Sequence, residues 1–84
     1  MITMPEWTIK HITPLENFSL RIDFIDGSAR LFDCTPLLEK AIYSPLHDKR
    51  FFGRVYLSCG GAAWNEDIDI SPEYLYEHSE IINR

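Results

Sequence analysis

The acidic stretch ahead of the C-terminal segment holds the densest group of side chains that could do chemistry. Asp67 and Asp69 are separated by one residue, with Glu66 and Glu73 close by in the chain. Such carboxylates can hold a hard cation or act as an acid–base pair. An EF-hand-like calcium loop also needs a glycine and a third ligand, which this stretch lacks. We therefore favour a solvated edge, with Asp67 and Asp69 facing water and the alternating isoleucines facing the core.

Zinc or thiol chemistry would draw on three histidines and two cysteines, namely His11, His47, His78, Cys34 and Cys59. None of them has the spacing of a structural zinc site, and there is no CxxC motif. A Cys–His nucleophile pair meets only in the fold, so spacing leaves that alternative open, but no oxyanion signature accompanies either cysteine. We expect no metal, no cofactor and no enzyme activity, and two small buried cysteines in a reducing cytoplasm.

A basic and aromatic group lies in the middle of the chain. Lys49, Arg50 and Arg54 surround Phe51 and Phe52. The group could stack bases or grip an acidic partner, but we favour a helical turn with Phe52 in the core. Both rings cannot face inward on one short turn, so one ring should lie near the surface, which suggests an interface. With the acidic stretch, the candidate interface residues are Lys49, Arg50, Phe51, Arg54, Glu66, Asp67 and Asp69.

Composition indicates a single folded domain. The chain has 84 residues, 45% of them hydrophobic, and a formal net charge of −5 from thirteen acidic and eight basic residues. That balance weighs against binding of nucleic acid by the protein alone, which needs clustered lysine and arginine. The N-terminus lacks the pattern of a signal peptide, and no apolar stretch approaches the ~18 residues of a membrane span. We expect a soluble cytoplasmic protein that does not bind membranes.

The strongest structural pattern is the alternation of apolar and polar residues from Phe18 to Phe24, which predicts a half-buried strand. Asp26-Gly27 then predicts a two-residue hairpin turn, with the return strand over Ala29–Asp33. In that register Asp23 faces Arg30 as an exposed cross-strand pair. The core face would then consist of Phe18, Leu20, Ile22, Phe24, Ala29 and Leu31.

The remaining elements follow from turn and cap signals. We predict strands at Trp7–Thr13, ended by Pro14, and at Val55–Ser58 and Ala62–Trp64. Helices are predicted at Pro36–Ala41 behind a Thr35 cap and at Pro72–His78 behind Ser71, with a further turn capped by Asp48. The fold class is α+β: a small, mainly antiparallel sheet, formed by a three-stranded meander plus a second hairpin, with short helices including a C-terminal one. One domain covers 1–84, with its core at about 7–78.

Several short motifs recur in a specific order along the chain. They are the Phe24-Ile25-Asp26-Gly27 turn, Asp33, the Leu46 to Phe52 segment, Gly60-Gly61, Trp64, and Asp69-Ile70-Ser71-Pro72 through Leu75-Tyr76. In this order and spacing the chain resembles the small bacterial domain-of-unknown-function family 2442 from Trp7 to Tyr76. Members often carry a proline after the tryptophan and a glycine three residues after it. Asn65 and Asp67 stand there instead, so we expect a different loop path with more negative charge.

The resemblance implies no catalytic residues. Relatives look like partners of another small bacterial protein, in an arrangement similar to a toxin–antitoxin pair, and others look fused to a helix-turn-helix. We therefore expect a non-catalytic protein-interaction module, an antitoxin-like or accessory partner of a second small protein, whose acidic balance suits a basic partner. The alternatives are a structural domain that forms a homodimer through a sheet edge, and a regulator associated with a small ligand or nucleic acid.

Overall fold

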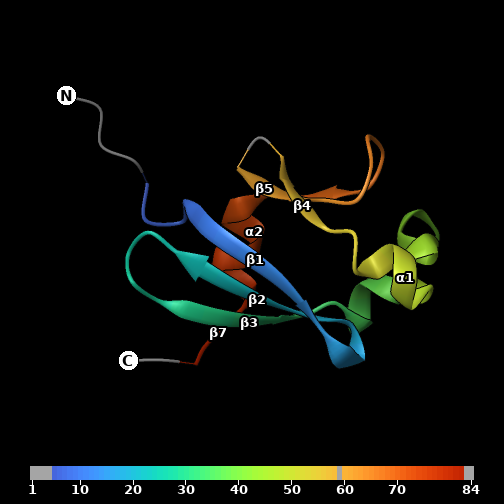
Figure 1. Ribbon diagram of the computed structural model, residues 1–84, viewed down its shortest axis with the longest axis horizontal. Coiled ribbons are helices and arrows are strands. Elements are labelled where there is room, and N and C mark those ends of the chain that lie inside the picture. Colours follow the sequence, from blue (N-terminus) through green and yellow to red (C-terminus); the bar gives the residue numbers. More distant parts are fainter. Residues whose placement is uncertain (1–4, 59, 83–84) are drawn as a thin grey trace.

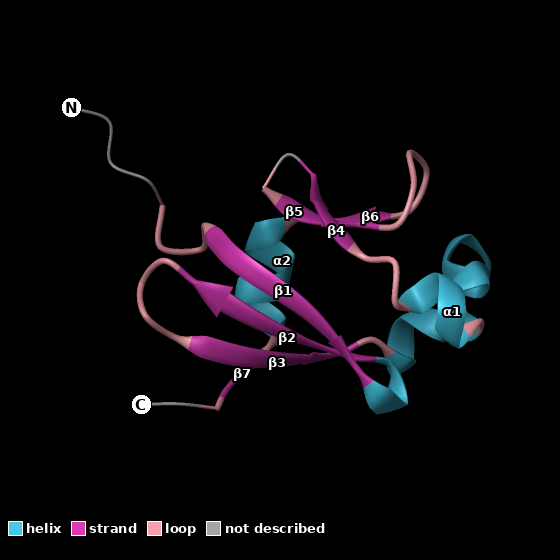
Figure 2. Cartoon of the chain, viewed as in Figure 1, coloured by secondary structure: helices cyan, strands magenta, loops and turns pink. Residues whose placement is uncertain are grey.

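The computed structural model describes residues 5–58 and 60–82 as two antiparallel sheets with short helices (Figures 1 and 2). The first sheet has the strand order β1-β2-β3-β7, with β1 at Ile9–Leu15, β2 at Ser19–Phe24, β3 at Ala29–Asp33 and β7 at Glu80–Ile81. The second has the order β4-β5-β6, with β4 at Tyr56–Ser58, β5 at Gly61–Ala63 and β6 at Asp69–Ile70. The predicted α+β class, with a meander, a second hairpin and a C-terminal helix, is confirmed.

Five short helical segments connect and cover the strands: 3-10 helices η1 (Glu16–Phe18), η2 (Thr35–Glu39) and η3 (Ala41–His47), and α-helices α1 (Lys49–Phe52) and α2 (Pro72–His78). The predicted caps of α1 and α2 are confirmed. The Asp48 carboxylate accepts the Arg50 N–H at 2.9 Å, and the Ser71 hydroxyl accepts the Tyr74 N–H at 3.3 Å. Both caps act within one turn, which is why the sequence locates them well.

The predicted helix at Pro36–Ala41 is wrong in type and in its cap. Lys40 takes an extended conformation that divides the segment into two 3-10 helices. Leu37 and Leu38 are both buried there, and Ile42 is 59% exposed, so the helical stripe expected from residue spacing does not form. Thr35 does not cap the segment: the N-cap position is Cys34, no side-chain cap hydrogen bond forms, and the Asp33 carboxylate accepts both the N–H and the hydroxyl of Thr35.

The predicted two-residue turn between β2 and β3 is also wrong. The loop holds three residues, since the Phe24 N–H donates to the Ser28 carbonyl at 2.9 Å and the Gly27 N–H donates to the Phe24 carbonyl at 3.1 Å. Gly27 has a φ of +92°, which fits a three-residue hairpin with glycine in the left-handed position. Asp23 therefore lies opposite Ala29 rather than Arg30.

This one-residue difference in register moves each side chain of β3 to the opposite face of the sheet from the one predicted. Ile22 lies opposite Arg30 and Leu20 opposite Phe32, so Arg30 and Phe32 share the core face. Leu31, which we placed in the core, lies on the other face and is half-buried. The expected pair of Asp23 with Arg30 is replaced by a contact of 3.3 Å between Asp23 and Arg21. Leu20, Ile22 and Phe24 are buried as predicted.

Strand β1 begins later and ends later than predicted. It runs through Pro14 to Leu15 instead of stopping before the proline. A proline is tolerated there because β1 is at the edge of its sheet, so the missing N–H can face away from β2. Strands β6 and β7, two residues each, had not been predicted, since no alternation pattern can develop over two positions.

Helix α2 joins the two sheets. It passes behind the first sheet in Figure 1 and contacts both β3 and β5. Leu75 is fully buried, and the ring of Tyr76 meets that of Phe24 edge-on at a centroid distance of 5.0 Å. Trp64 closes the core at the other end, where its indole N–H donates to the Phe52 carbonyl at 2.8 Å. The core thus lies between the first sheet, α2 and the second sheet.

Candidate functional site

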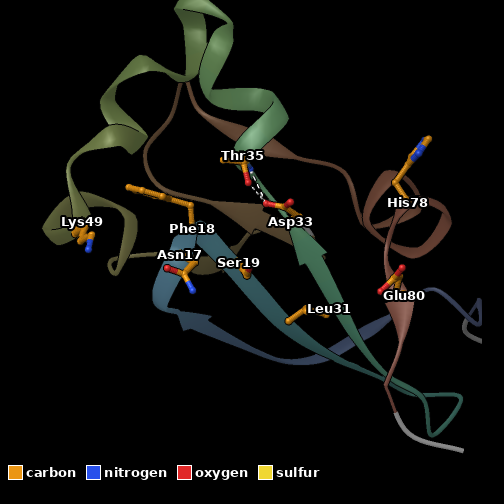
Figure 3. Close-up of a pocket in the computed structure, with 9 residues that line it drawn as sticks. All are labelled: Asn17, Phe18, Ser19, Leu31, Asp33, Thr35, Lys49, His78 and Glu80. Atoms are coloured by element: carbon orange, nitrogen blue, oxygen red, sulfur yellow. Dashed lines mark hydrogen bonds between the residues drawn. The ribbon is translucent and has the colours of Figure 1, made fainter.

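A groove of about 670 Å³ lies at the end of the first sheet where β2 begins and β3 ends (Figure 3). Seven elements line it, with Asn17 and Phe18 from η1, Ser19 from β2, Leu31 and Asp33 from β3, Thr35 from η2, Lys49 from α1, His78 from α2 and Glu80 from β7. Every lining residue is exposed or half-buried. The groove is therefore a surface feature, able to receive a segment of another molecule without enclosing it.

An unusual backbone conformation forms one wall of the groove. Asn17 and Phe18 have φ angles of 63° and 58°, in the left-handed region that non-glycine residues seldom adopt and bulky ones least of all. Phe18 is held there because its carbonyl accepts the Cys34 N–H at 2.9 Å and its ring packs edge-on against Phe52 at 5.5 Å. Residues in such conformations cluster at functional sites.

The groove carries charges of both signs. Lys49 lies at one side and His78 and Glu80 at the other, with Asp33 between them (Figure 3). Hydrogen bonds from the Thr35 hydroxyl, and then from the Thr35 backbone, lower the pKa of Asp33, so its carboxylate stays ionised. A surface with separated positive and negative groups suits the mixed side chains of a polypeptide better than the uniform charge of a phosphate backbone.

The basic candidates come from α1 and the residues after it. Lys49 lines the groove, and Arg50 and Arg54 are exposed. Phe52 is buried and Phe51 half-buried, as expected for two adjacent rings on one turn. Whether these residues contact a partner stays a prediction.

The acidic candidates lie in β6 and in the loop before it. Glu66, Asp67 and Asp69 are exposed, whereas Ile68 and Ile70 are buried, which confirms the predicted alternation. The loop before β6 is ordered by the Asn65 side chain, whose oxygen accepts the N–H groups of Asp67 and Ile68 at 2.8 Å each. The tryptophan preceding this loop packs on Phe52 at a centroid distance of 5.8 Å. The acidic and the basic segment are therefore both anchored to the same part of the core, the contact between Trp64 and Phe52.

The thiol and imidazole groups of the described residues lie in different surroundings. Cys34 is fully buried, and this burial, with the nearby Asp33 charge, raises the pKa of its thiol to about 12. His47 contacts the Leu38 carbonyl at 2.9 Å, and His78 stacks against Tyr74 at 4.2 Å. Cys59 lies outside the described residues. Across residues 5–58 and 60–82, no three His, Cys, Asp or Glu side chains converge as metal ligands would.

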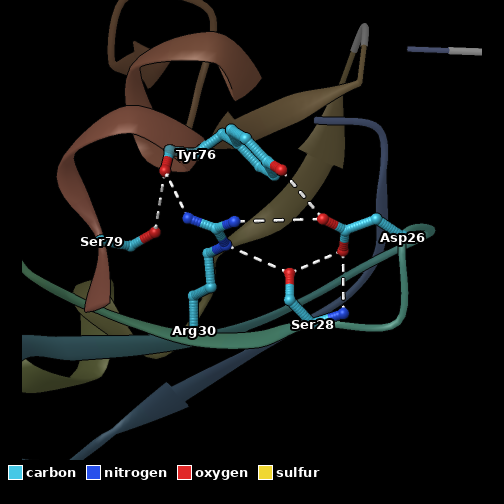
Figure 4. Close-up of polar contacts among 5 residues, drawn as sticks. All are labelled: Asp26, Ser28, Arg30, Tyr76 and Ser79. Atoms are coloured by element: carbon cyan, nitrogen blue, oxygen red, sulfur yellow. Dashed lines mark hydrogen bonds and ion pairs between the residues drawn. The ribbon is translucent and has the colours of Figure 1, made fainter. Parts of the chain in front are cut away.

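A polar cluster that the sequence analysis missed joins the β2–β3 turn to α2 (Figure 4). The Arg30 guanidinium donates to the Tyr76 carbonyl at 3.0 Å and to the Ser28 hydroxyl at 3.1 Å. Asp26 accepts the Tyr76 hydroxyl at 2.9 Å and lies 3.9 Å from Arg30. The only signal in the sequence was the Asp26-Gly27-Ser28 turn. It does not indicate that Asp26 contacts Tyr76, fifty positions further along the chain.

Comparison with known proteins places the chain in a family. Residues 9–80 match the family described as "Protein of unknown function (DUF2442)". The chain belongs to this family. No curated protein and no solved structure shows a significant match to it.

The matched range of this DUF2442 chain includes the whole groove lining, from Asn17 to Glu80. The family description names no activity. Within the described residues, no helix has both the length and the apolar character required to cross a membrane.

Proposed function

We propose that this protein is a non-catalytic protein-interaction module, the antitoxin-like or accessory half of a two-protein bacterial system in the cytoplasm. The observation that carries the proposal is the open groove between η1, β3 and β7. Its lining is exposed or half-buried throughout and mixes charges, hydrogen-bonding groups and the rings and aliphatic carbons of Phe18 and Leu31. Such a surface can bury a peptide segment but cannot exclude water from a reacting group.

Three further features support a partner protein. The net charge of −5 would steer a basic partner toward the molecule and discourage acidic ones. Lys49 lines the groove and provides a local positive charge. This charge would fix the orientation of such a partner by pairing with one of the partner's carboxylates. Aromatic residues beside arginines, as at Phe51 and Arg50, are enriched at the centres of interfaces.

The test is a pull-down of the tagged full-length protein from its native cells, followed by mass spectrometry. We expect one small basic protein to be recovered repeatedly. Lys49→Glu should reduce its recovery strongly, whereas Lys10→Glu, the same charge change on exposed Lys10 of β1, should not. Charge reversal of Glu66 and Asp67 should slow the association, most visibly at low salt. Recovery of the protein alone, as a monomer, would contradict the proposal.

A second candidate is self-association through β4. This strand is at the edge of its sheet, all three of its residues are exposed, and Tyr56 and Leu57 are 47% and 42% exposed. Strand β4 contains no charged residue, so an antiparallel pairing of two copies centred on Leu57 would bring no like charges of this strand together. Light scattering distinguishes the candidates, because a self-associating domain runs as a homodimer that Leu57→Lys converts to a monomer, with no second protein recovered.

A further inference from the structure

A second, smaller pocket of about 220 Å³ lies between the η2–η3 segment, β6 and the start of α2. Its floor is apolar, because Leu37 and Ile70 line it and are only 7% and 5% exposed. Tyr43 and Tyr74 line its sides, and Asp69, one of the residues singled out by the sequence, lines it as well. Two aromatic rings, one acidic residue and one lysine, Lys40, thus surround a single small recess.

Contacts with neighbouring residues hold both tyrosines in place. The Tyr43 hydroxyl donates to the Asp69 backbone carbonyl at 3.4 Å. The Tyr74 ring meets Phe32 edge-on at 5.9 Å and lies 4.2 Å from the His78 ring. Tyr74 is nevertheless 41% exposed, so part of this large ring is uncovered. The walls are positioned before any ligand arrives, which lowers the entropic cost of binding.

The pocket is lined by one charge of each sign, Asp69 and Lys40, and neither takes part in an ion pair among the described residues. The pKa of Tyr43 is raised first by burial and next by the Asp69 carboxylate, so this carboxylate lies near the phenol, which stays neutral. The two ion pairs in the described part of the chain join Arg21 to Asp23 and Arg30 to Asp26, so Asp69 belongs to neither. Lys40 also lines the pocket without pairing to Asp69, and it is the group that opposes cation binding there.

We propose that this pocket receives a single arginine side chain, supplied by the partner protein of the proposed function, on which this inference rests. A guanidinium can stack on a tyrosine face while donating to a carboxylate, which a lysine ammonium does less well. The volume of 220 Å³ lies below the roughly 300–1,000 Å³ of pockets that take drug-sized ligands, and suits one side chain. The acidic balance of the protein favours the same occupant.

The test uses a small probe and the full-length protein. N-acetyl-L-arginine methylamide is titrated into labelled protein and followed by the NMR shifts of backbone amides. We expect saturable shifts at Tyr43, Asp69 and Tyr74, and binding weaker by about ten-fold or more for the citrulline analogue, which has the same length but no charge. Equal binding of the two probes, or shifts spread evenly over the acidic surface, would overturn the proposal.

Matched variants locate the site. Asp69→Asn should weaken arginine binding about ten-fold, whereas Glu77→Gln, which removes the same charge from an exposed carboxylate of α2 that does not line the pocket, should leave it unchanged. Lys40→Gln should tighten binding, because it removes the opposing charge. Equal weakening by Asp69→Asn and Glu77→Gln would show general charge attraction only, and would overturn the pocket assignment.

The two proposals can fail separately. Arginine binding that depends on Asp69 supports the pocket even where the pull-down recovers no partner, which would contradict the proposed function alone. A partner recovered equally well by Asp69→Asn and by the unaltered protein would leave the proposed function standing and overturn the role of the pocket.

Discussion

Arg30 makes the contact that ties the β2–β3 turn to helix α2. Its guanidinium carbon lies 3.8 Å from the centroid of the Tyr76 ring and 5.6 Å from that of Phe24. The head group is only partly exposed, so its cation–π contact and its hydrogen bond to the Tyr76 carbonyl are less screened by solvent than those of a fully exposed pair. Asp26, at the turn, accepts the Tyr76 hydroxyl and completes the link.

The first prediction concerns the pKa of Asp26. Hydrogen bonds from the Ser28 hydroxyl and then from the Ser28 backbone lower it below the ordinary 3.8. Burial opposes them less strongly, and the Tyr76 hydroxyl and the Arg30 charge lower the pKa further. Ser28→Ala should therefore raise this pKa, measured by NMR titration of the carboxyl carbon. Ser44→Ala, which replaces an exposed serine of η3, should not.

The same lowered pKa predicts a pH dependence of stability. A carboxyl group with a lowered pKa in the folded state stabilises the protein above its unfolded-state pKa, and this stabilisation is lost as the pH falls through the folded-state pKa. The destabilisation caused by Ser28→Ala should therefore be larger near neutral pH than in acid. Thermal unfolding at several pH values measures it, and a loss that grows as the pH falls would contradict the assignment.

At the scale of the elements, the β2–β3 loop depends on one glycine. Gly27 has a φ of +92°, so Gly27→Ala should lower the free energy of unfolding by about 1 kcal/mol or more. Gly53 provides the control, because its φ is −69° and an added Cβ would meet the Lys49 and Arg50 carbonyls at 3.5 and 3.7 Å, ordinary contact distances. Gly53→Ala should be neutral or stabilise by up to about 1 kcal/mol in urea unfolding. Equal losses at both sites would contradict the left-handed turn.

The junction between α1 and β5 depends on one side-chain hydrogen bond. Trp64 is 5% exposed and donates to the Phe52 carbonyl, so Trp64→Phe should leave that buried carbonyl without its partner. We expect a loss of about 1 to 3 kcal/mol in unfolding free energy, in addition to any change in packing. Trp7→Phe makes the same substitution at a half-buried position outside this junction and should cost less. A larger loss at Trp7 would contradict this role for Trp64.

At the scale of the whole molecule, the net charge of −5 predicts that the protein alone does not bind nucleic acid. The exposed basic residues in and just after α1 are few, namely Lys49, Arg50 and Arg54. A gel shift with duplex DNA at physiological salt should show no retardation. Retardation that weakens steeply with added salt, and disappears when those three residues are reversed in charge, would contradict the prediction.

The sequence by itself determined the features that depend on near neighbours in the chain. The alternation through Leu20, Ile22 and Phe24 located β2 and its buried face. Ser71 followed by Pro72 located α2 with the bounds observed, because a cap and a first-turn proline act within one turn. The order of the short motifs also placed the chain in its family.

Only the tertiary structure decided the features that join distant segments. Asp26-Gly27 is compatible with both a two-residue and a three-residue loop, and the packing of Arg30 against Tyr76 accompanies the longer one. The groove and the tyrosine pocket each draw on several elements, so no local pattern marks them. Local patterns report which face of an element is apolar, whereas register and pockets depend on contacts between elements, whose energies no single stretch of sequence contains.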